Sequence, residues 1–115
     1  MRQPMLKWVE GKGVTDMTVS TVSYWKGGKH EQMVAVASKA KAFFTKHGAE
    51  RFQLNFVHAG PDAGQWVAVI TYSNWESYGK AMQALTNDPE YQALLAQVSA
   101  ISELTGRRIV VSIDL

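Results

Sequence analysis

The order in which strand-like and helix-like segments follow one another is the feature that most limits how this chain can fold. Residues 17–25 are rich in β-branched and aromatic side chains, which is typical of a strand. Residues 29–47 carry apolar side chains at three- and four-residue spacing, which predicts one buried face of a helix. Two further strands are predicted over 51–58 and 65–72, joined by the turn-rich segment 59–64.

A second helical segment follows the third predicted strand. Ser73 and Glu76 fit a capping box, so a helix is predicted to begin there and to run to about Leu85. Asp88 and Pro89 then restart the helix, because aspartate is a good N-cap and proline is tolerated at the first helical position.

Gly106 is expected to break this helical pattern, and residues 108–115 are predicted to form the last strand. The resulting order, βαββαβ, predicts an α+β protein with a ferredoxin-like sandwich over residues 17–115. In this fold two helices cover one face of a four-stranded antiparallel sheet. The strand 65–72 is apolar on both faces, so a homodimer that packs sheet on sheet is expected. Residues 1–16 are predicted to be an irregular N-terminal extension.

Composition excludes several kinds of chemistry. The chain has 115 residues and no cysteine, which rules out disulfides, thiolate nucleophiles and cysteine-bound metals. The histidines His30, His47 and His58 lack the spacing of metal ligands, so neither a metal site nor a cofactor is expected. No apolar run approaches the ~18 residues that span a bilayer, and the start lacks the apolar stretch of a signal peptide. We therefore expect a cytoplasmic protein without a membrane partner.

The net charge of +2 is small, and the basic residues are concentrated in the first half of the chain. A basic first half favours either an anionic small ligand or a weak nucleic-acid contact. The alternative, which we prefer, is that the lysines of the segment 29–47 form the solvated face of a helix. Nucleic-acid-binding domains have denser basic clusters with aromatic residues between them, so no nucleic-acid partner is expected.

Three short motifs give the chain a resemblance to a known superfamily. They are Gly64-Gln65-Trp66, Tyr72-Ser73-Asn74-Trp75-Glu76 and Asn87-Asp88-Pro89-Glu90-Tyr91-Gln92. With the order of elements over 17–115, they resemble the dimeric α+β barrel superfamily, and within it the NIPSNAP-like and antibiotic-biosynthesis monooxygenase-like branch. The resemblance implies a homodimer and, in many members, a ligand pocket between the sheet and the helices of each subunit. It specifies the fold better than the function, because members carry different chemistry.

His58 is the best candidate for a catalytic residue. It is predicted to end the second strand on the same face as Phe52, Leu54 and Phe56, next to a glycine-rich loop. An imidazole at the mouth of a pocket can act as an acid or a base near neutral pH. The alternative is a strand-end histidine that bonds only to backbone or water.

Tyr24, Trp66 and Tyr72 complete the predicted ligand-binding set with His58. Their hydroxyl and indole groups can hydrogen-bond a phenolic substrate, as the resemblance to cofactor-independent oxygenases implies. The alternative is that these aromatic residues belong to the core. Haem-degrading members of the superfamily bind iron through a histidine on the second helix, but residues 74–102 contain none. The resemblance therefore does not extend to haem chemistry.

Two functions remain open at this stage. The first is a small-molecule-binding or monooxygenase-like protein that acts on an aromatic or hydrophobic ligand in a pocket between sheet and helices. The second is a non-catalytic homodimeric structural or interaction module, whose apolar faces are all used by core and interface. Since no phosphate-binding or nucleophile motif is present, the sequence does not decide whether the protein is an enzyme.

Overall fold

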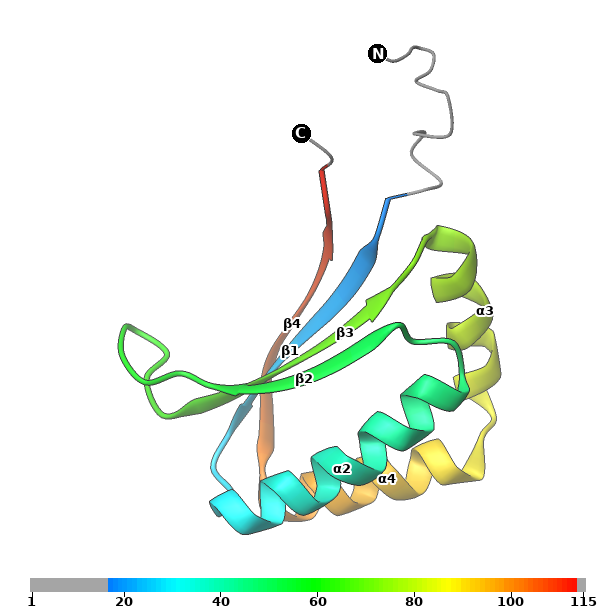
Figure 1. The fold of residues 1–115 in the computed structure, drawn as a ribbon. Helices are drawn as coiled ribbons and strands as arrows, with labels where there is room; N and C mark the ends of the chain where they lie inside the picture. The colour runs from blue at the N-terminus through cyan, green and yellow to red at the C-terminus, as the bar shows by residue number, and fades with distance from the viewer. Residues whose placement is uncertain (1–16, 114–115) are drawn as a thin grey trace.

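The computed structural model describes residues 17–113, and within them four strands form one antiparallel sheet with three helices on one side (Figure 1). The elements are β1 (Val19–Lys26), α2 (His30–Lys46), β2 (Arg51–Phe56), β3 (Gln65–Tyr72), α3 (Trp75–Thr86), α4 (Pro89–Ile101) and β4 (Glu103–Val111). The predicted α+β class and the βαββαβ order are confirmed, with the second helical segment divided into α3 and α4. The predicted extension, residues 1–16, lies outside the described residues.

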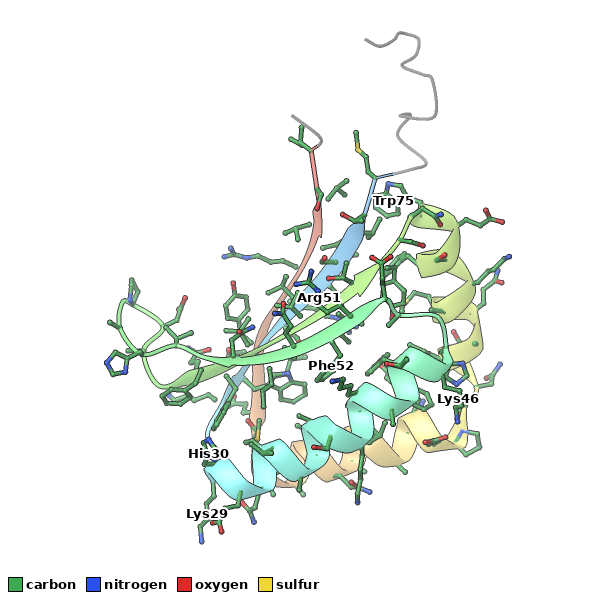
Figure 2. All side chains as sticks on the ribbon, viewed as in Figure 1. Lys29, His30, Lys46, Arg51, Phe52 and Trp75 are labelled. Carbon is green, nitrogen blue, oxygen red and sulfur yellow. The ribbon has the colours of Figure 1, made fainter. Side chains whose placement is uncertain are left out.

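The sheet has the strand order β2-β3-β1-β4, so β3 and β1 are central. Because side chains alternate along a strand, each strand places every second residue under the helices. Figure 2 shows Phe52 directed toward α2 and Arg51 on the opposite side of β2. We call these two sides the helix face and the open face. Pairing aligns Leu54, Ala68, Ser23 and Arg107 in one row across the helix face.

The helices α2 and α4 lie side by side across the helix face, and α3 is inclined toward one end of the sheet (Figure 1). Phe43, Leu85 and Leu94 form the buried contact among the three helices. The helix α2 ends at Lys46, and Gly48 follows its cap with a φ of 97°, while the Ala49 N–H donates to the Phe44 carbonyl at 2.9 Å. A glycine in the left-handed region directly after the last turn is a common way for a helix to end. No helix of the described part is long and apolar enough to cross a membrane.

The two later helices begin at side-chain caps. Asn74 caps α3, because its side-chain oxygen accepts the Ser77 N–H at 2.8 Å. The predicted cap at Ser73 is therefore wrong by one residue, since asparagine is as good an N-cap as serine and comes directly before the first helical residue. Asp88 caps α4 as predicted and accepts from the Glu90 N–H at 2.7 Å, with Pro89 in the first turn.

The last strand begins earlier than predicted. β4 spans Glu103–Val111, so Gly106 lies inside the strand and does not precede it. Tyr24 pairs with Gly106 and Trp25 with Leu104, which leaves Thr105 as the extra residue of a β-bulge. The Thr105 hydroxyl lies 2.8 Å from the Gln65 side-chain oxygen. Gly106 pairs with Tyr24 directly beside this bulge, and a glycine inside a strand often marks such a site.

Candidate functional site

A cavity of about 130 Å³ lies between the sheet and the α2–α4 pair, and we call it the inner cavity. Small side chains line it on both layers: Thr21, Ser23 and Ala68 at the centre of the sheet, and Ala37 and Ala40 on α2. The layers cannot close over these small residues, because larger side chains around them hold the sheet and helices apart. The larger lining residues include Met33, Phe44, Phe52, Leu54, Ile70, Tyr91, Leu94, Leu95 and Val98.

Apart from Tyr91 on α4, the polar side chains that line this cavity belong to β1 and β4. Ser23 lies directly opposite Arg107 in the register, and Thr21 is the next residue of β1 on the helix face. The Trp25 indole N–H donates to the Ser23 hydroxyl oxygen at 3.1 Å. Arg107 is the one basic residue in the lining, which contains no carboxylate. The cavity therefore suits a mainly apolar molecule with an oxygen directed toward β1 and β4.

Tyr72 lies next to the cavity and has an unsatisfied hydroxyl. Its side chain is fully buried and packs with Phe44 and Ile70, which both line the cavity. The hydroxyl oxygen has no hydrogen-bond partner among the described residues. Burial raises the pKa of Tyr72 to about 12, with a smaller contribution from Tyr78, whose ring centroid is 5.6 Å away. A buried hydroxyl without a partner is costly to the folded state.

Substituting Tyr72 with phenylalanine is expected to raise the free energy of unfolding by roughly 1 kcal/mol, because the unsatisfied hydroxyl is removed. The change is also expected to reduce the loss of stability in alkali. The folded pKa of about 12 lies above the ordinary value of 10.0, so the stability from this group is full below pH 10 and is lost between pH 10 and pH 12. Urea unfolding at neutral and alkaline pH measures both effects, with Tyr24→Phe as the control. A variant that is as alkali-sensitive as the wild type would contradict this prediction.

A second, open hollow of about 330 Å³ lies between α2 and the edge strand β2. We call it the outer groove. It shares Ala37, Phe52 and Leu54 with the inner cavity, so the two spaces meet at a common wall. The rest of its lining is His30, Val34, Ser38, Lys41, Phe56 and Trp66.

The structure does not bring the four predicted site residues together. Trp66 is buried and lines the outer groove, and Tyr72 lies on the same face of β3 beside the inner cavity. Tyr24 is on the open face, where the Arg108 guanidinium lies 5.7 Å from its ring centroid. His58 is exposed in the connection between β2 and β3, and it lines neither space.

The predicted strand 51–58 is too long at its end, because β2 stops at Phe56. Past that point the chain turns, with the Gly64 N–H donating to the Val57 carbonyl at 2.8 Å. This connection projects from the end of the sheet away from the helices (Figure 1). A catalytic role for His58 stays a prediction that its exposed position does not favour.

Arg107 and Ser23 are functional candidates that sequence reasoning missed. The alternation of Ile109 and Val111 extends back to Arg107 on the same face, but the predicted strand began at Arg108 and left Arg107 out. Ser23 was visible as a small polar residue in the first strand, but its position in a cavity depends on which residues lie opposite it. The pairing of β1 with β3 and β4 determines which residues these are.

Acidic and imidazole side chains do not form a cluster suited to a metal. Within residues 17–113, no three histidine, aspartate or glutamate side chains are grouped closely enough to hold a metal ion. His47 Nε2 lies 3.3 Å from Asp88 Oδ2, without the alignment of a hydrogen bond, and joins the end of α2 to the start of α4. This contact is structural, because neither residue lines the inner cavity or the outer groove.

The arrangement of sheet and helices is that of the ferredoxin-like α+β proteins, as solved structures show. SnoaB, a cofactor-independent oxygenase from Streptomyces nogalater, is 16% identical over 86% of this chain and 96% of its own, with a TM-score of 0.66. An uncharacterised NIPSNAP-like domain protein from Burkholderia xenovorans is 13% identical over 88% of this chain and 87% of its own, with a TM-score of 0.63. A dimeric ferredoxin-like protein from an uncultured marine organism is 13% identical over 86% of this chain and 98% of its own, also with a TM-score of 0.63.

Comparisons of sequence add no family to this result. No family model matches the chain, and no curated protein matches it either. The resemblance expected from the sequence is confirmed in the structural likeness to SnoaB and to NIPSNAP-like proteins. At these low identities the likeness shows the fold.

Proposed function

We propose that this protein binds a small aromatic molecule in the inner cavity and acts on it as a monooxygenase-like enzyme. The observation that carries the proposal is a mainly apolar cavity of single-ring size, whose one basic residue and two hydroxyl side chains lie on the β1–β4 wall and whose one further hydroxyl, that of Tyr91, belongs to α4. An apolar protein cavity of about 150 Å³ accepts benzene, so a cavity of about 130 Å³ suits one aromatic ring. The likeness to SnoaB, a cofactor-independent oxygenase, supports the reaction type.

The residues of the β1–β4 wall can favour an ionised ring hydroxyl. A guanidinium that hydrogen-bonds to an oxygen favours its charged form, so Arg107 would lower the pKa of a bound phenol. Ser23, opposite Arg107, can donate a second hydrogen bond through its hydroxyl. A phenolate is more electron-rich than the phenol and reacts more readily with dioxygen, the oxidant of the proposed reaction. One oxygen atom would enter the ring, which becomes a quinone, and the other would leave as water. The proposed role of Arg107 and Ser23 is therefore to bind and orient a phenolic oxygen.

A titration with para-cresol and toluene tests this proposal. Both rings are expected to bind, and para-cresol more tightly, since only its hydroxyl can bond to Arg107. Arg107→Leu is expected to lower the affinity for para-cresol about 10- to 100-fold, the range for a hydrogen bond to a charged group, and to leave toluene unchanged. Arg107→Lys is the matched control that keeps the charge. Isothermal calorimetry measures the affinities, and an oxygen electrode measures turnover of para-cresol.

Absence of binding by either ring would contradict the proposed function and favour the non-catalytic module. Binding without oxygen consumption would leave a small-molecule-binding protein and contradict the oxygenase activity. Equal loss of para-cresol and toluene affinity in Arg107→Leu would contradict the role of Arg107 as the oxygen-binding residue.

We also propose a homodimer that packs through the open face. Val22 and Val69 are paired neighbours there, Val67 is also on this face, and all three are only half-buried in the single chain. Val110 is 46% exposed on the same face. The likeness to a dimeric ferredoxin-like protein supports this assembly. A second copy related by a two-fold axis would cover the same valines on both chains.

Val69→Asp is expected to convert the dimer into a monomer, because the substitution places a charge at the centre of the buried face. Light scattering after size-exclusion chromatography measures the mass of each species. Gln83→Asp adds the same carboxylate at an exposed position of α3 and should leave the dimer intact. A wild-type protein that is monomeric at ~10 µM, well above the Kd of a stable complex, would contradict the proposed assembly.

A further inference from the structure

The outer groove lies beside the inner cavity and is open to solvent. The wall that the two spaces share is made of Ala37 on α2 and of Phe52 and Leu54 on β2. Figure 2 shows Phe52 directed from β2 toward α2. A substituent that passes between these three side chains from a ring in the cavity would reach the outer groove.

Apolar groups that line the outer groove are unusually exposed. Phe56 is 52% exposed and Val34 is 43% exposed, although both border a concave surface. Trp66 is buried at the base, with its ring centroid 4.8 Å from that of Phe56 and 5.7 Å from that of His30. Exposed apolar side chains around a hollow are typical of a surface that binds an apolar segment.

The outer groove is lined by one lysine, Lys41, and one histidine, His30, and by no acidic side chain. Among residues 17–113, Lys46 is paired with Glu90 at 2.8 Å, whereas no ion pair is formed by Lys41. Ser38 uses its hydroxyl proton within the helix, because it donates to the Val34 carbonyl at 2.9 Å. The outer groove therefore combines an apolar base with a cationic rim, which is complementary to an apolar arm that ends in an anion.

We propose that the outer groove binds the carboxylate end of the same ligand that occupies the inner cavity. The ligand class is then an aromatic ring with an aliphatic arm that ends in a carboxylate. Lys41 pairs with the carboxylate, His30 contributes to the rim, and the arm lies against Phe56 and Trp66. This inference rests on the proposed function, because it requires the ring to be seated in the cavity.

A series of arm lengths tests the inference on the full chain. Phenylacetate, phenylbutyrate and phenylhexanoate are compared with the alcohols of the same length by isothermal calorimetry. At one arm length the carboxylate is expected to bind about tenfold more tightly than its alcohol, as a charge-assisted hydrogen bond allows. In Lys41→Gln this difference should vanish, while the affinity of the alcohol stays the same. Lys39→Gln is the matched control, because Lys39 is on the same helix but outside the lining of the outer groove.

Three results would overturn the inference, and they are distinguishable. Carboxylates and alcohols that bind equally at every length would overturn it and leave the proposed function standing, since the ring still binds. Equal losses in Lys41→Gln and Lys39→Gln would overturn it in favour of general attraction by the basic helix. If neither series binds to the wild-type protein, the proposed function fails and the inference fails with it.

Discussion

Replacing Ala40 with leucine is expected to abolish binding of a single-ring ligand while the protein stays folded. Ala40 lines the inner cavity, and leucine adds three carbon atoms to a space of only about 130 Å³. The affinity for para-cresol should fall by at least ~100-fold, or about 2.8 kcal/mol. The larger side chain enters an existing void, so the usual cost of overpacking is reduced. Calorimetric titration and urea unfolding measure the two effects.

Ala42→Leu is the matched control for this experiment. Ala42 is two residues along the same helix and is exposed, so leucine there adds the same atoms outside the cavity. Its affinity for para-cresol should equal that of the wild type. If Ala40→Leu folds normally and also binds as tightly as the wild type, the ligand does not occupy the inner cavity.

Replacing Phe43 with alanine is expected to lower the free energy of unfolding by about 3–5 kcal/mol, the usual range for a buried phenylalanine. The Phe43 side chain is 1% exposed and packs with Leu85 and Leu94. Its ring lies 4.6 Å from that of His47 and 6.1 Å from that of Tyr91. Urea unfolding followed by circular dichroism measures the change, provided that the dependence on denaturant is the same in both proteins.

The control for this substitution is Phe56→Ala. Phe56 is 52% exposed at the edge of the sheet, so its loss should cost less than about 1 kcal/mol. Similar costs at the two positions would show that the α2–α4 contact is not the main core of the domain. Since α2 and α4 line the inner cavity, Phe43→Ala should also weaken ligand binding. Loss of a side chain that is as exposed as Phe56 but lies away from both spaces should not.

The order of elements could be predicted because it depends on local periodicity and local turn chemistry. The apolar spacing on residues 29–47 and the Asp88-Pro89 restart each have a physical meaning that needs no distant partner. Errors arose where distant strands decide the local structure. In the sequence taken by itself, Gly106 is typical of the end of a regular element. In the structure it pairs with Tyr24 of β1, beside the bulge at Thr105, and therefore lies within β4.

The candidate site was harder to predict than the fold, because a cavity is a property of opposed residues. Ala40 and Ala68 are unremarkable in the sequence, and only the packing of α2 on the sheet makes them line the same space. The predicted set relied on residue types that often bind ligands, and these types were distributed over both faces of the sheet and a loop. Trp66 and Tyr72 lie near the two spaces because they share the helix face of β3 with Ala68.

The void under α2 also determines how this protein should respond to hydrostatic pressure. Unfolding eliminates internal empty volume, so the unfolded chain and its solvent together occupy less space than the folded protein in water. Compression therefore favours the unfolded state, and the cavity of about 130 Å³ adds to this effect. A seated ligand, or a leucine at position 40, would remove that contribution. The ligand-free protein is therefore expected to unfold at a lower pressure than the Ala40→Leu variant or a ligand-bound form.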